Sequence, residues 1–414
     1  MRLEFFIASR LRPSSSEREG SPSLNVALTG IVLAIVVMIL SIAIVTGFKR
    51  EITNKVYSLD SHLKIGNAVL GLDNNYSSVD SDDVRAVLDT MPGITSAGLI
   101  IEKPAILKTD DNFMGLVYRG VDSAYDWRFI GDHLIAGRVP AVSDTSNQAE
   151  VALSQVTARA LNLDVGDKVL TYFIDDKVKM RNSLIVGIFS TDFETHDHTY
   201  MLGNIAQLQG VNGWDENMGN YVGVNLEDPT QADLTGAHIY SDLAMTTYSD
   251  DASTTLYTVT STTDNNAQFF TWLAMLDTNV VIILTLMMIV TGFTLIAALL
   301  MIVLERIKMI GLLKALGATN GMIRRTFIYL TGKLVIKALV IGNVVAIGLA
   351  LLQHYFHILR LDPESYYMPY VPVSINPLAL VLLNVGILVV AYITLLAPSM
   401  IIASIRPTTT MRFE

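Results

Sequence analysis

The sequence contains no cysteine among its 414 residues. Disulfide bonds, thiolate metal sites and a cysteine nucleophile are therefore excluded, and no lipid anchor on an N-terminal cysteine is expected. Charged residues are also scarce: they make up 16% of the chain, against about 25% in soluble globular proteins. The formal net charge is −10. Because phosphate neutralisation needs a basic surface, we expect no nucleic-acid partner.

Motifs for common catalytic chemistry are lacking as well. The only Gly-Lys pair is Gly332-Lys333, and Leu334 follows it where a P-loop needs Ser or Thr. Neither a G-x-S-x-G elbow nor an H-E-x-x-H motif occurs. The sequence therefore predicts a non-catalytic chain.

One short cluster could bind a metal. His196-Asp197-His198 lies close to Glu194, and two imidazoles with a carboxylate could ligate zinc. The cluster has no distant fourth ligand, so we interpret it as a solvated polar loop and expect no metal site.

What the sequence has in abundance is apolar residues, which form 51% of the chain. A bilayer core of about 30 Å needs about 20 helical residues to cross it. Four runs are long enough, and they predict membrane helices at residues 24–48, 278–304, 327–352 and 377–405. A cleaved signal peptide is the alternative for the first run. That run is longer than a typical signal core and no A-x-A site follows it, which favours a retained span.

Residues 49–277 have the composition of a soluble protein and alternate strand patterns with a few helix patterns. The predicted fold is an α-helical membrane protein with four transmembrane helices plus a mixed α+β extracytoplasmic domain inserted between helices 1 and 2.

Lys and Arg concentrate before the first run and between the second and third runs. Segments rich in these residues favour the cytoplasmic side of the membrane. The bias predicts that both termini lie inside and that residues 49–277 lie outside the cytoplasm. The chain then divides into a cytoplasmic N-terminal segment (1–23), an extracytoplasmic domain (49–277), a cytoplasmic loop (305–326), an extracytoplasmic loop (353–376) and a cytoplasmic tail (406–414).

The cytoplasmic loop contains a short amphipathic pattern. Met309, Leu312, Leu313 and Leu316 recur at helical spacing, and Gly317 follows as a natural C-terminal cap. Such a helix can rest in the membrane interface or insert its apolar face into a partner's groove. The pattern alone leaves both open.

This loop also carries a family resemblance. Residues 310–319, Ile-Gly-Leu-Leu-Lys-Ala-Leu-Gly-Ala-Thr, preceded by Glu305-Arg306, resemble the signature of FtsX-like ABC transporter permeases. The segments 5–11, 46–52, 366–373 and 403–407 are similar to the lipoprotein-releasing members. In that family the loop resembles the coupling helix that docks on a cytoplasmic ATPase. The ATPase-coupling residues it implies are Glu305, Arg306, Lys308, Met309, Gly311, Leu312, Leu313, Lys314, Leu316 and Gly317.

The resemblance implies a mechanotransmitting permease that extracts lipoproteins from the outer leaflet of the inner membrane. ATP and Mg would bind to a partner ATPase dimer, and none is expected in this chain. Further implied partners are a second permease subunit, identical or paralogous, a lipoprotein substrate, a periplasmic lipoprotein carrier and membrane lipids. An acyl-chain cavity between the first spans of two permeases would be lined by Met38, Ile42, Val45, Phe48 and Ile52, for which plain helix packing or lipid contact is the alternative.

Three other functions stay open at this point: an FtsX-like force transmitter acting on a periplasmic partner, an efflux permease of the macrolide-exporter type, and a receptor without an ATPase. One feature departs from the lipoprotein-releasing pattern. The hairpin that captures the carrier in one of the paired subunits corresponds here to Asp175–Asn182, which looks short. The partner subunit could recruit the carrier, the docking surface could differ, or the substrate could be something other than a lipoprotein.

Overall fold

The computed structural model describes residues 22–68, 78–142, 149–174, 177–249 and 256–399. Its contacts divide the chain into two units. The helical unit comprises Met1–Arg50, Trp272–Arg360 and Tyr370–Glu414, and the α/β unit comprises Glu51–Thr271 and Leu361–Pro369. The segments 5–11 and 403–407, on which part of the family resemblance rests, lie outside the described residues.

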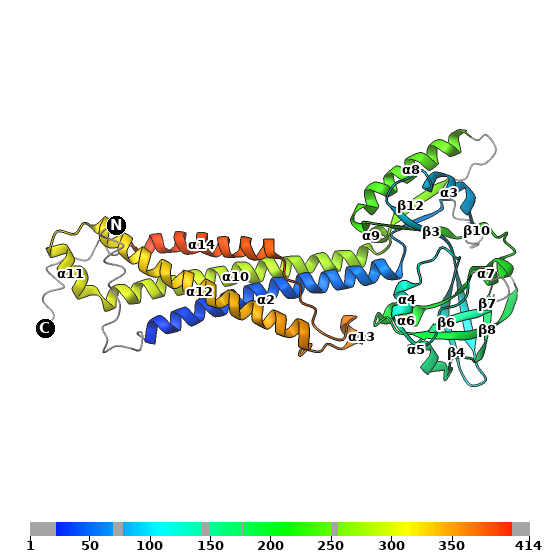
Figure 1. Cartoon of the computed structure of the whole chain (residues 1–414), viewed down its shortest axis with the longest axis horizontal. Coiled ribbons are helices and arrows are strands. Elements are labelled where there is room, and N and C mark those ends of the chain that lie inside the picture. The colour runs from blue at the N-terminus through cyan, green and yellow to red at the C-terminus, as the bar shows by residue number, and fades with distance from the viewer. Residues whose placement is uncertain (1–21, 69–77, 143–148, 175–176, 250–255, 400–414) are drawn as a thin grey trace. The chain divides into compact units, whose positions relative to one another are not determined.

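Four long helices dominate the helical unit and run alongside one another in Figure 1. They are α2 (Pro22–Leu59), α10 (Ala267–Glu305), α12 (Asn320–Phe356) and α14 (Pro377–Ser399). All four are long and apolar enough to cross a bilayer. The first three extend beyond the predicted spans, because polar turns at either end continue the helix that the apolar run begins.

The helices pack through one apolar cluster and one polar pair. Ile31 and Ile35 of α2 have no exposed surface and contact Leu295 of α10 and Ala338 of α12 in the same buried cluster. Gly342 of α12 lies so close to Ile35 that an added Cβ would come within 2.7 Å of its side chain.

The polar pair joins α12 to α14. The amide of Asn343 donates to the Asn384 side-chain oxygen at 2.8 Å, and the Asn384 amide donates back at 3.1 Å. Each amide also donates to the backbone oxygen one turn earlier. Within lipid such satisfied amide pairs hold helices together, because the alternative is an unsatisfied polar group in hydrocarbon.

The α/β unit is built on a ten-stranded mixed sheet in the order β12-β1-β11-β3-β4-β9-β6-β8-β5. Strand β7 pairs with both β3 and β8, so β3, β4, β9, β6, β8 and β7 form a closed ring. The strands of this sheet are β1 (Leu63–Asn67), β3 (Ile94–Lys108), β4 (Phe113–Val121), β5 (Leu134–Gly137), β6 (Glu150–Ser154), β7 (Lys168–Ile174), β8 (Val178–Phe189), β9 (Tyr200–Asn204), β11 (Tyr221–Leu226) and β12 (Tyr257–Ser261).

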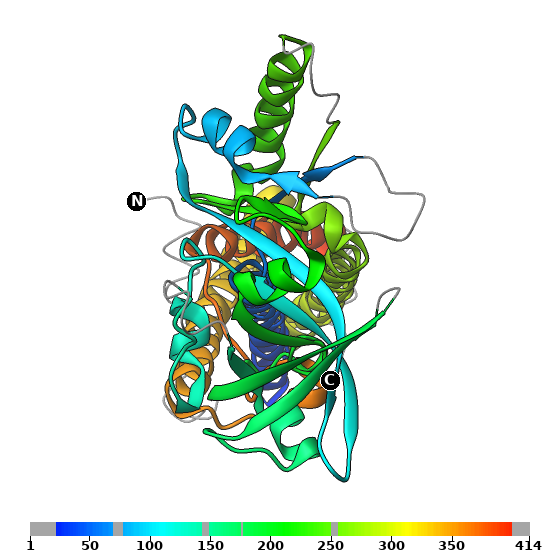
Figure 2. The same ribbon diagram turned by 90° about the vertical axis from the view of Figure 1, so that its right-hand side faces the viewer.

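Helices accompany the strands of this unit (Figure 2). They are α3 (Ser81–Leu88), α4 (Arg128–Asp132), α5 (Gln155–Leu161), α6 (Glu194–Thr199), α7 (Ile205–Asn212), α8 (Ala232–Ser249) and α9 (Thr262–Asn265); β2 (Val79–Asp80) and β10 (Met218–Gly219) form a separate two-stranded ladder. The fully buried Tyr118, Phe173 and Leu107 lie in the core between sheet and helices.

In chain order the sheet lies between α2 and α10, which fits the expected insertion of an α/β domain after the first span. The hairpin of β7 and β8 extends well beyond residues 175–182, the stretch that looked short against the family pattern. Its cross-strand pairs run from Lys168↔Leu184 to Ile174↔Val178. Asp175 and Asp176 at its turn lie outside the described residues.

Candidate functional site

The amphipathic segment that follows α10 is a separate helix, α11 (Ile307–Ala315). Gly317 has a φ of +91°. The N–H of Ala318 bonds to the Leu313 oxygen at 2.9 Å, and the N–H of Gly317 bonds to the Lys314 oxygen at 3.1 Å. This pair of bonds is a Schellman motif, which places glycine at the left-handed position after the helix. The predicted cap at Gly317 is confirmed.

The bundle covers only part of the apolar face of α11. Ile310 is fully buried among the ends of α10, α12 and α14, and Met309 and Leu313 pack partly buried in the same cluster. Leu312 and Leu316 remain 56% and 76% exposed. A helical wheel could not show which of these residues are buried, because it does not show which side of the helix the other helices cover.

The polar coupling residues lie on α11 and at the end of α10. Glu305 ends α10 and is exposed, and Arg306 and Lys314 are partly exposed. Gly311 is buried, and Lys308 belongs to the first turn of α11. The ten sequence-predicted coupling residues therefore lie on one short helix and its two ends, with Leu312 and Leu316 as its exposed apolar side chains.

The five predicted cavity residues on α2 are placed less uniformly. Met38 and Ile52 have no exposed surface within the chain. Ile42, Val45 and Phe48 are partly exposed, and the Phe48 ring meets Trp272 edge-on at 6.0 Å. Their contact with a substrate stays a prediction.

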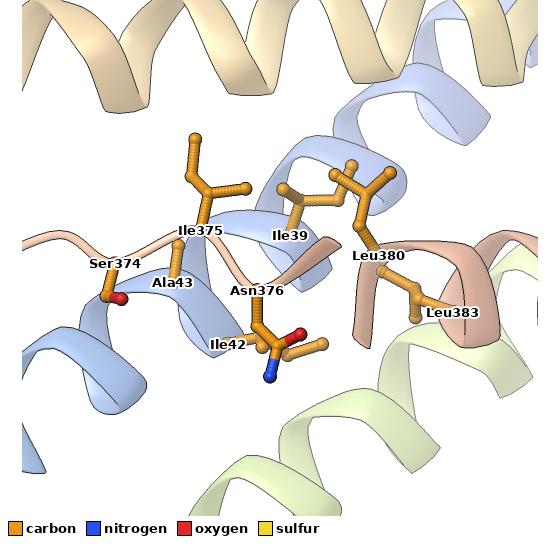
Figure 3. A pocket seen from close by; sticks show the side chains of 8 residues that line it. All are labelled: Ile39, Ile42, Ala43, Ser374, Ile375, Asn376, Leu380 and Leu383. Carbon is orange, nitrogen blue, oxygen red and sulfur yellow. The ribbon is translucent and has the colours of Figure 1, made fainter. Parts of the chain in front are cut away.

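A small apolar groove opens beside this stretch of α2 (Figure 3). Ile39, Ile42 and Ala43 line it from α2, and the segment before α14 covers it. That segment is pinned to the helix, since the N–H of Ser374 donates to the Ala43 oxygen at 2.9 Å. The full lining is Ile39, Ile42, Ala43, Ser374, Ile375, Asn376, Leu380 and Leu383.

Because Gly47 has no side chain, the covering segment can pass close to α2 at this position. A Cβ there would lie 2.7 Å from the Pro372 oxygen. We expect Gly47→Ala to lower the free energy of unfolding by about 1–3 kcal/mol, the usual cost of overpacking. Gly30→Ala on the same helix is the matched control, because its Cβ would meet only Thr294 at an ordinary 3.5 Å. Urea unfolding in detergent measures both; equal effects would contradict the close-crossing explanation.

A buried ionic cluster lies where α2 ends in the α/β unit. Arg119 of β4 is 3% exposed and lies directly opposite Glu102 of β3, with a nitrogen–oxygen distance of 2.7 Å. It also donates to the backbone oxygen of Leu59, the last residue of α2, at 2.9 Å. Arg119 thus joins the end of the α2 helix to the centre of the sheet.

Aromatic and acidic groups complete the cluster. The guanidinium stacks on Tyr200 at 4.1 Å, and Tyr221 donates to Glu102 at 2.8 Å. Burial by itself would raise the pKa values of Glu102 and Asp60, but the facing Arg119, with Lys64, holds both below their usual range. Both carboxylates are therefore ionised at neutral pH. Sequence reasoning missed this cluster, because its members come from the end of α2 and from five separate strands.

The His196-Asp197-His198 interpretation as a solvated loop is wrong. These residues form α6, in which His196 and Asp197 are 7% and 2% exposed. Asp197 accepts bonds from the Thr191 N–H at 3.0 Å and the Thr191 hydroxyl at 2.7 Å. His196 and Asp197 are thus buried residues of a helix, whereas His198 is exposed. Among the described residues no group of three or more His, Cys, Asp or Glu could hold a metal ion.

Comparison with known families matches both units. Residues 26–240, more than half of the chain, match the MacB-like periplasmic core domain, and residues 281–407 match the FtsX-like permease C-terminal family. The chain belongs to the FtsX/MacB-type ABC transporter permeases. The resemblance recognised in the α11 segment is therefore confirmed at the level of the family.

Two curated relatives of this permease carry the name lipoprotein-releasing system transmembrane protein LolC. The protein of Xylella fastidiosa is 23% identical over 94% of this chain and 93% of its own length. That of Neisseria meningitidis serogroup B is 22% identical over 50% of each chain, so the permease spans about half of that relative's length. The solved periplasmic region of MacB from Actinobacillus actinomycetemcomitans is similar over 53% of the permease and 97% of that chain, at 14% identity and a TM-score of 0.36.

Proposed function

We propose that this permease releases lipoproteins from the outer leaflet of the bacterial inner membrane, driven by a separate cytoplasmic ATPase that docks on α11. The observation that carries the ATPase part is the short capped helix with Leu312 and Leu316 exposed, directly after α10. Exposed leucines on a rigid helix suit a hydrophobic groove in a partner. In this proposal both termini and α11 are cytoplasmic, and the α/β unit is periplasmic.

The lipoprotein part is supported by the LolC relatives, one of which aligns over nearly the whole chain. In the proposal, ATP and Mg bind only to the ATPase dimer, and a second permease subunit completes the complex. ATP-driven closure of the ATPases pushes α11, and α10 carries the movement toward the α/β unit because it is one unbroken helix.

The β7–β8 hairpin offers a surface for a periplasmic carrier. Tyr172 lies opposite Met180 and Ile174 opposite Val178, so these four side chains share one face. Ile174, Val178 and Met180 are 56–63% exposed. An exposed apolar sheet face of this kind is typical of an interaction site, which makes recruitment of the carrier by this subunit part of the proposal.

A release assay tests the function. The permease, its ATPase and any second subunit are reconstituted in proteoliposomes with a labelled triacylated lipoprotein, and the soluble carrier is added with ATP. We expect labelled lipoprotein in the soluble fraction only with ATP and carrier together, at least about tenfold above the carrier-free control. A complex that hydrolyses ATP without releasing lipoprotein would contradict the proposal.

An efflux permease is the second candidate, favoured by the match of residues 26–240 to the MacB-like core domain. It predicts that small hydrophobic compounds stimulate ATP hydrolysis by the complex and that a lipoprotein does not. Measuring both stimulations with the same preparation distinguishes the two functions.

A further inference from the structure

The chain passes between its two units at four points, at 50/51, 271/272, 360/361 and 369/370. Two of these crossings lie within the unbroken helices α2 and α10, which transmit displacement directly. The other two are the legs of the loop between α12 and α14. A loop transmits a displacement only where its tip is held, so what fixes residues 361–369 decides whether α12 and α14 are coupled to the α/β unit.

Lys55 of α2 fixes this tip. Its side chain is buried, and its ammonium donates to the backbone oxygen of Tyr367 at 3.1 Å and to that of Thr191 at 3.0 Å. Thr191 follows β8 in the sheet. One buried cation therefore joins α2, the end of a sheet strand and the tip of the loop. A buried ammonium is unfavourable unless its donors are satisfied, and hydrophobic packing at the same place would serve stability as well.

The backbone at Tyr367 is held in a conformation that it would not adopt by itself. Tyr367 has a φ of +61°, which is rare for a bulky residue. Its ring packs on Phe193 at 4.9 Å and on Phe269 at 6.2 Å. Met368 beside it is 2% exposed. Such conformations persist where the surroundings over-determine them, and they concentrate at clamps and switches.

The opposite end of the loop is closed as firmly. The side chain of Gln353 donates to the oxygens of Leu359 and Val371 and accepts from the Leu359 N–H. In the tip itself, the N–H of Leu361 bonds to the Pro369 oxygen at 3.0 Å. The loop is thus hydrogen-bonded both at its base and at its tip.

We propose that Lys55 is a positioning residue that latches the α12–α14 loop to the α/β unit, so that all four crossings move together during the transport cycle. The latch rests on the proposed function only in what its movement accomplishes. The contacts that form it lie within the α/β unit, and a measurement without substrate can test them.

The test uses the full permease–ATPase complex in lipid nanodiscs. Lys55→Met removes the ammonium that makes both hydrogen bonds and keeps a side chain of similar length. Lys55→Arg restores a cation. Tyr367→Gly removes the ring that packs on Phe193 and Phe269 from the loop side. Glycine accepts the positive φ at this position. Tyr366→Gly, whose ring is exposed on the preceding residue, is the matched control.

We expect Lys55→Met and Tyr367→Gly to raise amide hydrogen exchange in 361–369 at least about tenfold. Release per ATP should fall about tenfold while ATP hydrolysis stays within about twofold of wild type. Lys55→Arg and Tyr366→Gly should resemble wild type. Unchanged exchange in both latch variants would overturn the proposal, and so would raised exchange with release per ATP at the wild-type level.

A distance measurement separates failure of the latch from failure of the proposed function. The sequence has no cysteine, so Ser365→Cys and Asn182→Cys accept spin labels specifically. If the wild type releases no lipoprotein, this measurement decides alone. With the latch intact, the label-to-label distance should stay single and narrow with and without ATP, and in Lys55→Met it should broaden. Equal widths in both proteins would overturn the latch.

Discussion

Replacing Arg119 with methionine is expected to lower the free energy of unfolding of the α/β unit by about 3–5 kcal/mol, the usual effect of removing one partner from a buried ion pair. The loss arises because Glu102 and Asp60 would remain buried and ionised without their counter-charge, and the Leu59 oxygen at the end of α2 would lose its donor. Urea unfolding of the full chain in nanodiscs measures this loss, followed by tryptophan fluorescence with Trp272 replaced by phenylalanine so that Trp127 and Trp214 report on the α/β unit.

The free energy of unfolding should depend on pH differently in wild type and in Arg119→Met. In wild type the lowered pKa values of Glu102 and Asp60 mean that their stabilisation is present above the unfolded pKa, about 4, and is lost as pH falls through the lower folded values. Without Arg119, burial dominates and raises the pKa of Glu102, so protonation favours the folded variant. The difference between wild type and Arg119→Met should therefore shrink from pH 7 to pH 4.

Two controls identify the cause. Adding Glu102→Gln to Arg119→Met removes a buried charge and should recover part of the lost stability. Arg128→Met breaks the exposed pair with Asp126 and should leave unfolding unchanged, because exposed ion pairs contribute little. If Arg119→Met unfolds at the same urea concentration as Arg128→Met, the buried cluster does not stabilise the sheet.

Leu312→Asp or Leu316→Asp is expected to weaken association with the ATPase at least about 30-fold, which corresponds to the loss of an interface hot spot of about 2 kcal/mol. Both side chains are largely exposed, so the substitutions should leave the permease folded. Leu313→Asp would be less informative, because Leu313 packs against the buried ends of the helices. Co-purification and titration with the purified ATPase measure the effect.

Leu359→Asp is the matched control for these variants, since Leu359 is 56% exposed just beyond the other end of α12. It should bind the ATPase like wild type. An alternative outcome would favour the interfacial interpretation of α11: unchanged ATPase binding in Leu312→Asp and Leu316→Asp, with reduced protection of α11 by lipid. That result would contradict the coupling assignment.

The helices and their caps could be predicted well because their signals are local. Uncharged runs longer than a bilayer core predict spans regardless of tertiary contacts, and Gly317 after an apolar helical pattern predicts a left-handed cap. The exposed face of α11 could not be predicted in the same way. Met309, Leu312, Leu313 and Leu316 are equivalent on a helical wheel, and only the packing of α10, α12 and α14 separates the buried from the exposed.

Polar clusters were the least predictable part. Asp197 looks like part of a solvated loop in sequence, because the groups that satisfy it lie elsewhere: the Thr191 donors precede the cluster, and Ser154, whose hydroxyl donates to the Asp197 backbone oxygen, is on β6. Arg119, Glu102, Asp60 and Tyr221 are separated by long stretches of chain and meet only through strand register.

By itself, the sequence determined four apolar runs long enough to span a membrane, an α/β-type domain that follows the first run in the chain, and the family resemblance of the segment at 305–319, because apolar length, charge scarcity and a contiguous motif are properties of the chain. Only the tertiary structure decided which leucines of α11 remain accessible, that Arg119 joins α2 to the sheet, and that Lys55 holds the α12–α14 loop. Each of these depends on residues distant in sequence meeting in a buried place, where an unsatisfied charge or carbonyl is costly and its partner is therefore fixed.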